Sequence, residues 1–223
     1  TERALFDSID HNFFFFFFHV ELFAETYAGD LGTKAWSDFM IQSGKIVLTG
    51  WPMDYMPKIL EKYKGAPKRD LVLFPHRIAP EKQPEIFKHM RASMPNYEFV
   101  ICQERQLTKA TYHSLLAEAK IVFSCSLQET LGISPYEGAI LGAVPLLPDR
   151  LSYTEMYDKK FKYKSEWTSD HLTYINNAYQ IQSRIEDIME NYDKWVEPTA
   201  KLADDLTAKF FSAGPMVEVI KCS

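Results

Sequence analysis

Short apolar runs alternate with amphipathic stretches along most of this chain. Four of these runs are apolar along their whole length, which is typical of strands buried on both faces of a parallel sheet. They predict strands at residues 71–75, 98–103, 120–126 and 144–148. The spacing of apolar residues between and after these runs predicts helices at about 80–93, 108–118, 134–141, 170–191 and 193–211. The alternation therefore predicts an α/β fold, a parallel sheet with helices on both faces.

The first part of the chain is organised differently. Residues 13–18 are six consecutive phenylalanines. A run of one residue type cannot encode which face is buried, so we expect a strand buried on both sides, which would favour aggregation if it were exposed. An amphipathic helix is predicted to follow, from His19 to about Ala28.

Length and composition limit the class of protein. At 223 residues, with 46% hydrophobic and 14% aromatic residues, the chain can bury one core of α/β size together with an attached part-domain. The net charge of -5 gives no overall basic surface for nucleic acid, although a local basic groove is compatible with it. No apolar run approaches the ~18 residues of a membrane span, and no signal peptide is visible. We therefore expect a cytoplasmic protein without a membrane span.

The cysteines show no metal-ligand spacing, and the histidines are scattered. Cys102 and Cys125 fall within predicted strands, and we expect both to be small buried residues of a reducing compartment. His76 follows a predicted strand and is the histidine best placed to contact a ligand. The others in this part of the chain are predicted to lie on helix surfaces: His89, His113 and His171.

Two carboxylates, Glu129 and Glu137, flank the junction between a predicted strand and the next helix. In open α/β sheets this edge is where ligands bind, and free amides at helix N-termini attract phosphate there. The small neighbours Gly138 and Ala139 indicate that Glu137 lies on a packed helix face, although a surface position is the alternative. A buried acid needs a partner, so Glu137 is a candidate binding residue.

The segment 129–146, ETLGISPYEGAILGAVPL, resembles the Glu-x7-Glu motif of retaining glycosyltransferases with the GT-B fold, above all family 4, whose typical string is EGFGLPLLEAxAxGxPV. The resemblance includes both acids, Gly132, Gly142 and Pro145. This chain carries one extra residue between the last two. A pair of acids at this spacing is common by chance, whereas the pair together with these glycines and the proline is not.

A second resemblance lies upstream. Residues 71–82, LVLFPHRIAPEK, are similar to the family's apolar strand followed by G-R-L-x-P-E-K-G. Arg77 and Lys82 keep the offset of the family's two cations, which implies that they hold the donor diphosphate and stabilise the departing nucleotide. His76 stands where the family has glycine, so we expect the loop to approach the donor less closely. The alternative is that both cations are ordinary solvated charges.

The resemblance also implies a domain organisation. Residues 63–190 would form a Rossmann-like, nucleotide-sugar-binding domain, the C-terminal domain of a GT-B enzyme. Residues 1–62 would be the last part of the N-terminal, acceptor-side domain with its linker, because the string 45–54, KIVLTGWPMD, resembles the family's segment ending N-G-V-D. Residues 191–223 would carry a helix that crosses back to the N-terminal part, with packing inside the donor domain as the alternative.

The activity implied by the resemblance is transfer of a sugar from a UDP- or GDP-sugar to an acceptor, with retention of configuration. Neither a metal nor another cofactor is expected, in agreement with the absence of an Asp-x-Asp motif. Glu129 would hold sugar hydroxyls and Glu137 the ribose. The other expected contacts are the backbone amides of Thr130, Leu131 and Gly132, and a loop beside the base from Gln103 to Leu107.

Several alternatives stay open at this point. Paired carboxylates also serve glycoside hydrolases, but the neighbouring cations favour a phosphate ligand. A non-catalytic nucleotide-sugar-binding module, or a fragment of a two-domain enzyme, is the main rival, and the GT-B fold also serves epimerases and phosphorylases. The acceptor could be a glycan, a protein or a DNA base. The DNA base is included because segments 128–134 and 148–157 resemble glycosyltransferase-like proteins encoded by bacteriophages, some of which modify bases in DNA. A second copy of the chain is a further candidate partner.

Overall fold

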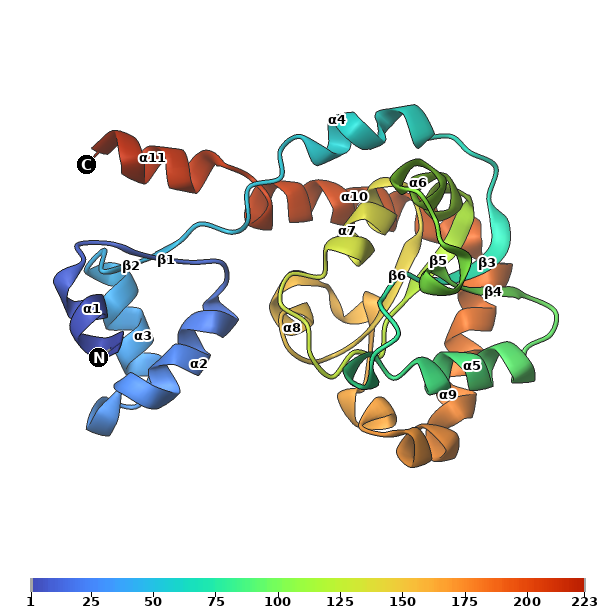
Figure 1. Ribbon diagram of the computed structural model, residues 1–223, viewed down its shortest axis with the longest axis horizontal. Helices are drawn as coiled ribbons and strands as arrows, with labels where there is room; N and C mark the ends of the chain where they lie inside the picture. The colour runs from blue at the N-terminus through green and yellow to red at the C-terminus, as the bar shows by residue number, and fades with distance from the viewer. Residues whose placement is uncertain (1, 223) are drawn as a thin grey trace. The chain divides into compact units, whose positions relative to one another are not determined.

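The computed structural model describes residues 2–222, which form two compact units (Figure 1). Unit 1 combines the residues up to Asp54 with those from Thr207 onward, and unit 2 runs from Tyr55 to Leu206. Among the described residues no helix is both long and apolar enough to cross a membrane.

Unit 2 is built on a five-stranded sheet in which every pair of neighbours is parallel. In spatial order the strands are β4 (Glu98–Ile101), β3 (Arg69–Phe74), β5 (Ala119–Phe123), β6 (Val144–Pro148) and β7 (Lys162–Tyr163). The predicted parallel sheet is confirmed. The two-residue β7 was not predicted, because so short a strand leaves no pattern in the sequence.

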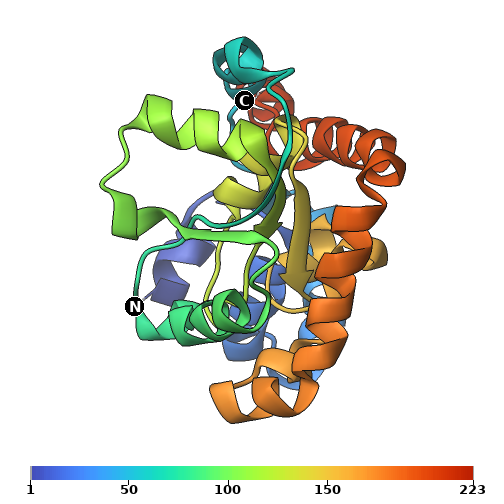
Figure 2. The same cartoon turned by 90° about the vertical axis from the view of Figure 1, so that its right-hand side faces the viewer.

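The centre of this sheet is buried on both faces. Leu71, Val72, Leu73 and Phe74 follow one another in β3, and none of them is exposed. Because successive side chains of a strand point to opposite faces, four consecutive buried residues require a cover on each side. In Figure 2 the strands lie between α6 (Lys109–Glu118) on one side and α9 (His171–Glu190) on the other.

The other helices of unit 2 connect and cover the strands. They are α4 (Met56–Leu60), α5 (Pro84–Ser93), α7 (Ile133–Ile140), α8 (Tyr153–Met156) and most of α10 (Tyr192–Phe210). The helix predicted at 80–93 begins later, at Pro84, and this part of the prediction is wrong. Pro80–Lys82 form a separate 3-10 turn, and Gln83 after it has a left-handed φ of 53°, which interrupts any continuous helix.

Unit 1 contains a second, two-stranded parallel sheet. The sheet pairs β1 (Asn12–Phe14) with β2 (Ile46–Leu48). The helices of the unit are α1 (Glu2–Ser8), α2 (Phe17–Tyr27), α3 (Thr33–Gln42) and α11 (Gly214–Cys222). Phe6, Val20, Ala24, Trp36 and Ile46 form its buried core. The end of α10 and the residues after it join this unit, since the amides of Trp51 and Met53 donate to the carbonyls of Phe210 and Phe211.

The phenylalanine run does not form the strand that its composition suggested. β1 covers only its first two phenylalanines, and Phe13 is 49% exposed, so a strand buried on both sides is wrong. The helix starts inside the run, at Phe17, two residues before the predicted start. Phe16, Val20 and Ala24 are buried at helical spacing. The apolar stripe of the helix has therefore set the local structure.

Candidate functional site

A pocket of about 580 Å³ opens at the carboxyl ends of β3 and β4. Four residues singled out from the sequence line it: His76, Arg77, Gln103 and Leu107. The remaining lining comes from Pro75, Cys102, Gln106, Thr108, Lys109 and Tyr112. The structure thus brings together the loop after β3, the segment after β4 and the start of α6, as expected for a ligand site of a parallel sheet.

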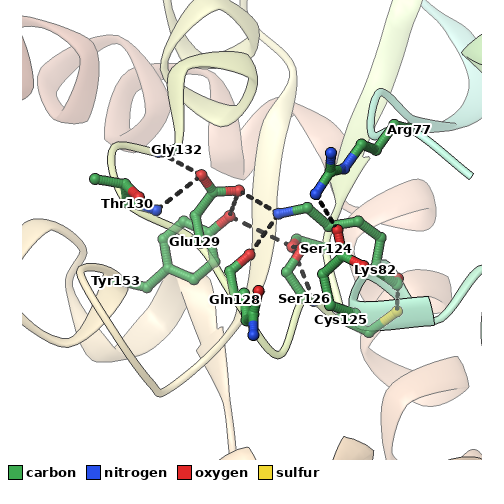
Figure 3. A network of polar contacts seen from close by, with 11 residues as sticks. Arg77, Lys82, Ser124, Cys125, Ser126, Gln128, Glu129, Thr130, Gly132 and Tyr153 are labelled. Atoms are coloured by element: carbon green, nitrogen blue, oxygen red, sulfur yellow. Dashed lines mark hydrogen bonds and ion pairs between the residues drawn. The ribbon is translucent and has the colours of Figure 1, made fainter. Parts of the chain in front are cut away.

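Glu129 lies in the loop after β5, where four donors hold its carboxylate (Figure 3). Oε1 accepts hydrogen bonds from the backbone amides of Thr130, at 3.1 Å, and Gly132, at 3.3 Å. Oε2 accepts from Lys82 Nζ at 3.2 Å and from the Tyr153 hydroxyl at 3.5 Å. Burial alone would raise the pKa of this carboxyl, but Lys82 beside it holds the pKa below its usual value. Glu129 is therefore a carboxylate at neutral pH and can only accept hydrogen bonds.

Lys82 contacts Glu129 although the two residues are 47 positions apart in the sequence. Its ammonium also donates to the carbonyl of Gln128, so both partners belong to the loop after β5. The side chain of Lys82 is only 12% exposed. Gln83 fixes the turn that follows Lys82, because its buried side-chain amide donates to the carbonyls of Cys125 and Thr168. A partly desolvated ion pair thus stands at the edge of the sheet.

Arg77, the other predicted cation, is in a different environment. Its side chain is 70% exposed and pairs with Glu81, four residues along the chain. It lines the pocket but does not join the hydrogen bonds around Glu129, as Figure 3 shows. Surface ion pairs of this kind contribute little to stability. The two cations are therefore unequal, and Lys82 is the one built into the site.

The turn after Glu129 requires a glycine. Gly132 has a φ of +61°, and a Cβ at this position would lie 2.7 Å from the ring of Tyr153. Two of the three amides that we expected to face a donor, those of Thr130 and Gly132, donate to Glu129 in this structure. The amides of the turn therefore orient the Glu129 carboxylate, and a ligand that bound them would share them with this carboxylate.

Glu137, in α7, is 2% exposed and is held by three side chains of α6. Oε1 accepts from Lys109 Nζ at 2.9 Å and contacts His113 Nε2 at 3.2 Å, while Oε2 accepts from the Tyr112 hydroxyl at 3.0 Å. The prediction that Glu137 lies on a packed helix face is confirmed. These three partners occupy one helix face, so their spacing of three and four residues was the available signal.

The prediction for His113 is wrong. Its side chain is 2% exposed and packs between α6 and Glu137, against the rings of Tyr63 and Tyr112. The tertiary contact with α7 decides its position, and helical periodicity alone did not show it. His171 is exposed as predicted, whereas His89 is half-buried beside the Tyr174 hydroxyl.

His76 is 7% exposed, and its Nε2 has no hydrogen-bond partner within the described part of the chain. Its ring packs against that of Phe74. Burial, opposed by Glu129 and assisted by Lys82, lowers the pKa of His76 from 6.5 to about 4. His76 is therefore neutral at pH 7, with one buried nitrogen without a partner.

This environment predicts a pH-dependent stability of unit 2. The unfolded chain protonates His76 near pH 6.5, but the folded chain only near pH 4, so stability falls as the pH drops through that interval. Between pH 7 and pH 5 the loss is expected to be about 2 kcal/mol. Urea unfolding followed by circular dichroism at both pH values measures it. His76→Asn should remove this part of the pH dependence; an unchanged slope would show that other groups cause it.

The cysteines near the site are buried thiols. Cys102 and Cys125 are unpaired and buried, which confirms the prediction that both are buried, although both lie just beyond the strand ends. Burial raises the pKa of Cys102 to about 12 and that of Cys125 further. Within residues 2–222, no group of three or more His, Cys, Asp or Glu side chains is arranged to hold a metal ion.

Comparison with known proteins bears on the fold. No protein-family model matches the chain, and no curated protein matches it in sequence. The pneumococcal O-GlcNAc transferase GtfA, solved with UDP and GlcNAc, superposes with a TM-score of 0.64 and 13% identity, over 97% of this chain and 45% of GtfA. A TarM variant of S. aureus, solved with Fondaparinux, alpha-GlcNAc-glycerol and UDP, gives 0.64 and 14%, over 99% of this chain and 45% of TarM.

Identities this low show a shared fold alone. The chain spans about 45% of the length of GtfA and of TarM. Its five-stranded parallel sheet with helices resembles one domain of a GT-B glycosyltransferase, as the motifs around Glu129 and Lys82 implied. The chain therefore has an α/β fold that resembles one domain of a GT-B glycosyltransferase, and it is structurally similar to about half of GtfA and of TarM.

Proposed function

We propose that unit 2 binds a nucleoside diphosphate sugar and that the chain carries the donor-binding half of a retaining glycosyltransferase. The main support is the Lys82–Glu129 ion pair, 3.2 Å apart at the carboxyl edge of a parallel sheet. A cation suits the diphosphate of such a donor, and a carboxylate suits the hydroxyls of its sugar. Both side chains of this pair are largely buried, 12% and 16% exposed, whereas Arg77 in the neighbouring pair with Glu81 is 70% exposed.

The proposed donor lies across the site from the pocket to Glu129. The pocket of about 580 Å³ is of ligand size and would take the base beside Gln103 and Leu107. The ribose would lie toward Glu137, and the diphosphate between Arg77 and Lys82. UDP is the first nucleotide to test, because both GtfA and TarM were solved with it.

The chemistry needs little from the protein beyond position and charge. The bond between the anomeric carbon and the diphosphate oxygen breaks, and a bond from the acceptor oxygen forms on the same face of the sugar. The acceptor proton passes to the departing diphosphate. Lys82 would stabilise the negative charge that grows on this leaving group, while Glu129, ionised and fixed by the turn at Gly132, would hold the sugar.

A thermal-shift screen with UDP, GDP, ADP, UDP-GlcNAc and uridine tests the proposal. A ligand at a hundred times its dissociation constant should stabilise the folded chain by about 2.7 kcal/mol. We expect a nucleoside diphosphate or its sugar to stabilise the chain and uridine to have a much smaller effect. Equal effects of UDP and uridine, or no effect of any nucleotide, would contradict it.

Release of UDP from UDP-GlcNAc separates a transferase from a binding module. A transferase half should hydrolyse the donor slowly when no acceptor is present, because water can replace the acceptor hydroxyl. Binding of UDP-GlcNAc with no release over days would favour the alternative of a non-catalytic nucleotide-sugar-binding module. High-performance liquid chromatography of the nucleotides measures this directly.

A further inference from the structure

The hydrogen bonds of Glu137 leave little room for a ligand. A carboxylate offers about four lone pairs, and donors from α6 already use three of them. Lys109 and His113 both meet Oε1, and Tyr112 donates to Oε2. One lone pair, on Oε2, is therefore left open. A ribose has two neighbouring hydroxyls, at C2′ and C3′, and needs two acceptors to bind through both.

Two of the three partners of Glu137 also lie on the side of the pocket. Lys109 and Tyr112 line the pocket, whereas Glu137 is not part of the lining. Lys109 is the movable one of the three, since its side chain is 68% exposed and that of His113 only 3%. It is the first residue of α6, where the helix dipole disfavours a cation. Displacing Lys109 from Glu137 thus costs less than displacing the buried His113.

Building on the proposed function, we propose that Lys109 occupies the position of one ribose hydroxyl on Glu137 and thereby sets how well the chain distinguishes ribonucleotides from 2′-deoxyribonucleotides. With Lys109 in place, Glu137 accepts one hydroxyl, and a 2′-deoxy ligand loses little. Once Lys109 is removed, Oε1 becomes available and the second hydroxyl contributes a charge-assisted hydrogen bond.

The test compares UDP and 2′-deoxy-UDP by isothermal titration calorimetry on three chains: the unaltered protein, Lys109→Met and Lys201→Met. Lys201 is an exposed lysine of α10 in unit 2, so its substitution makes the same change in net charge away from the pocket. For Lys109→Met we expect UDP to bind about tenfold more tightly, and 2′-deoxy-UDP to change less than about twofold. Lys201→Met should match the unaltered protein for both ligands.

The remaining outcomes contradict either the inference about Lys109 or the proposed function. If Lys109→Met weakens both ligands equally, Lys109 holds the phosphates and the inference is wrong. An unchanged ratio of the two affinities also overturns it. If neither nucleotide binds any of the three chains, the proposed function fails and the inference with it. Circular dichroism melting of Lys109→Met checks the fold, which should stay intact because Tyr112 and His113 still hold the buried carboxylate of Glu137.

Discussion

Replacing Lys82 by methionine is expected to weaken UDP binding by about a hundredfold, because a partly buried ammonium that meets a diphosphate contributes a strong charge-assisted hydrogen bond. The substitution also leaves the carboxylate of Glu129, now without its cation, near the incoming diphosphate. Uridine carries no phosphate, so its affinity should change little. Isothermal titration calorimetry with both ligands measures the difference.

Arg77→Met is the matched control for this prediction. Arg77 lines the same pocket, but its side chain is 70% exposed and pairs with Glu81. Exposed charges interact weakly through water, so we expect a loss of less than about fivefold. In Lys82→Met, a second change of Glu129→Gln should restore part of the UDP affinity by removing the repulsion. Equal losses for UDP and uridine would contradict the diphosphate role of Lys82.

Replacing Gly50 by alanine is expected to destabilise unit 1 by about 3 kcal/mol or more. A Cβ on Gly50 would lie 2.2 Å from the carbonyl oxygen of Phe210. This oxygen cannot move away easily, since it accepts a hydrogen bond from the amide of Trp51 at 2.8 Å. The φ of +61° at Gly50 adds strain for any residue with a side chain.

Gly29→Ala separates the two causes of this effect. Gly29 has a similar φ of +54°, but nothing lies within 4 Å of a Cβ there. It should therefore cost only the backbone strain, about 1 kcal/mol. Hydrogen exchange in β1 and β2 reports the stability of unit 1. Equal losses in both variants would show that the contact between Gly50 and Phe210 contributes nothing.

The parallel sheet could be predicted because its strands are buried on both faces. The apolar run at Leu71 to Phe74 is too short for a helix of its own and so favours a central strand, and the helices between the runs follow from their own spacing. The phenylalanine run carries no such pattern. There the neighbours decided the outcome, with Val20 and Ala24 completing the buried helix stripe that starts at Phe16.

The candidate site was only partly visible in the sequence. The motifs singled out Lys82 and Glu129, and the fold places them in one ion pair although 47 residues separate them. The engagement of Glu137 by Lys109 and His113 was missed, because it depends on how α6 packs beside α7. The sequence also did not show that Lys82 is buried and Arg77 exposed, since both residues keep the motif spacing and only their burial differs.

A crystal structure of the chain with UDP tests the central claim most directly. We predict that the diphosphate lies within hydrogen-bonding distance of Lys82 Nζ, that the uracil fills the pocket beside Gln103 and Leu107, and that the ribose points toward Glu137. UDP bound away from the carboxyl ends of β3 and β4, or bound there with its phosphates remote from Lys82, would contradict the account.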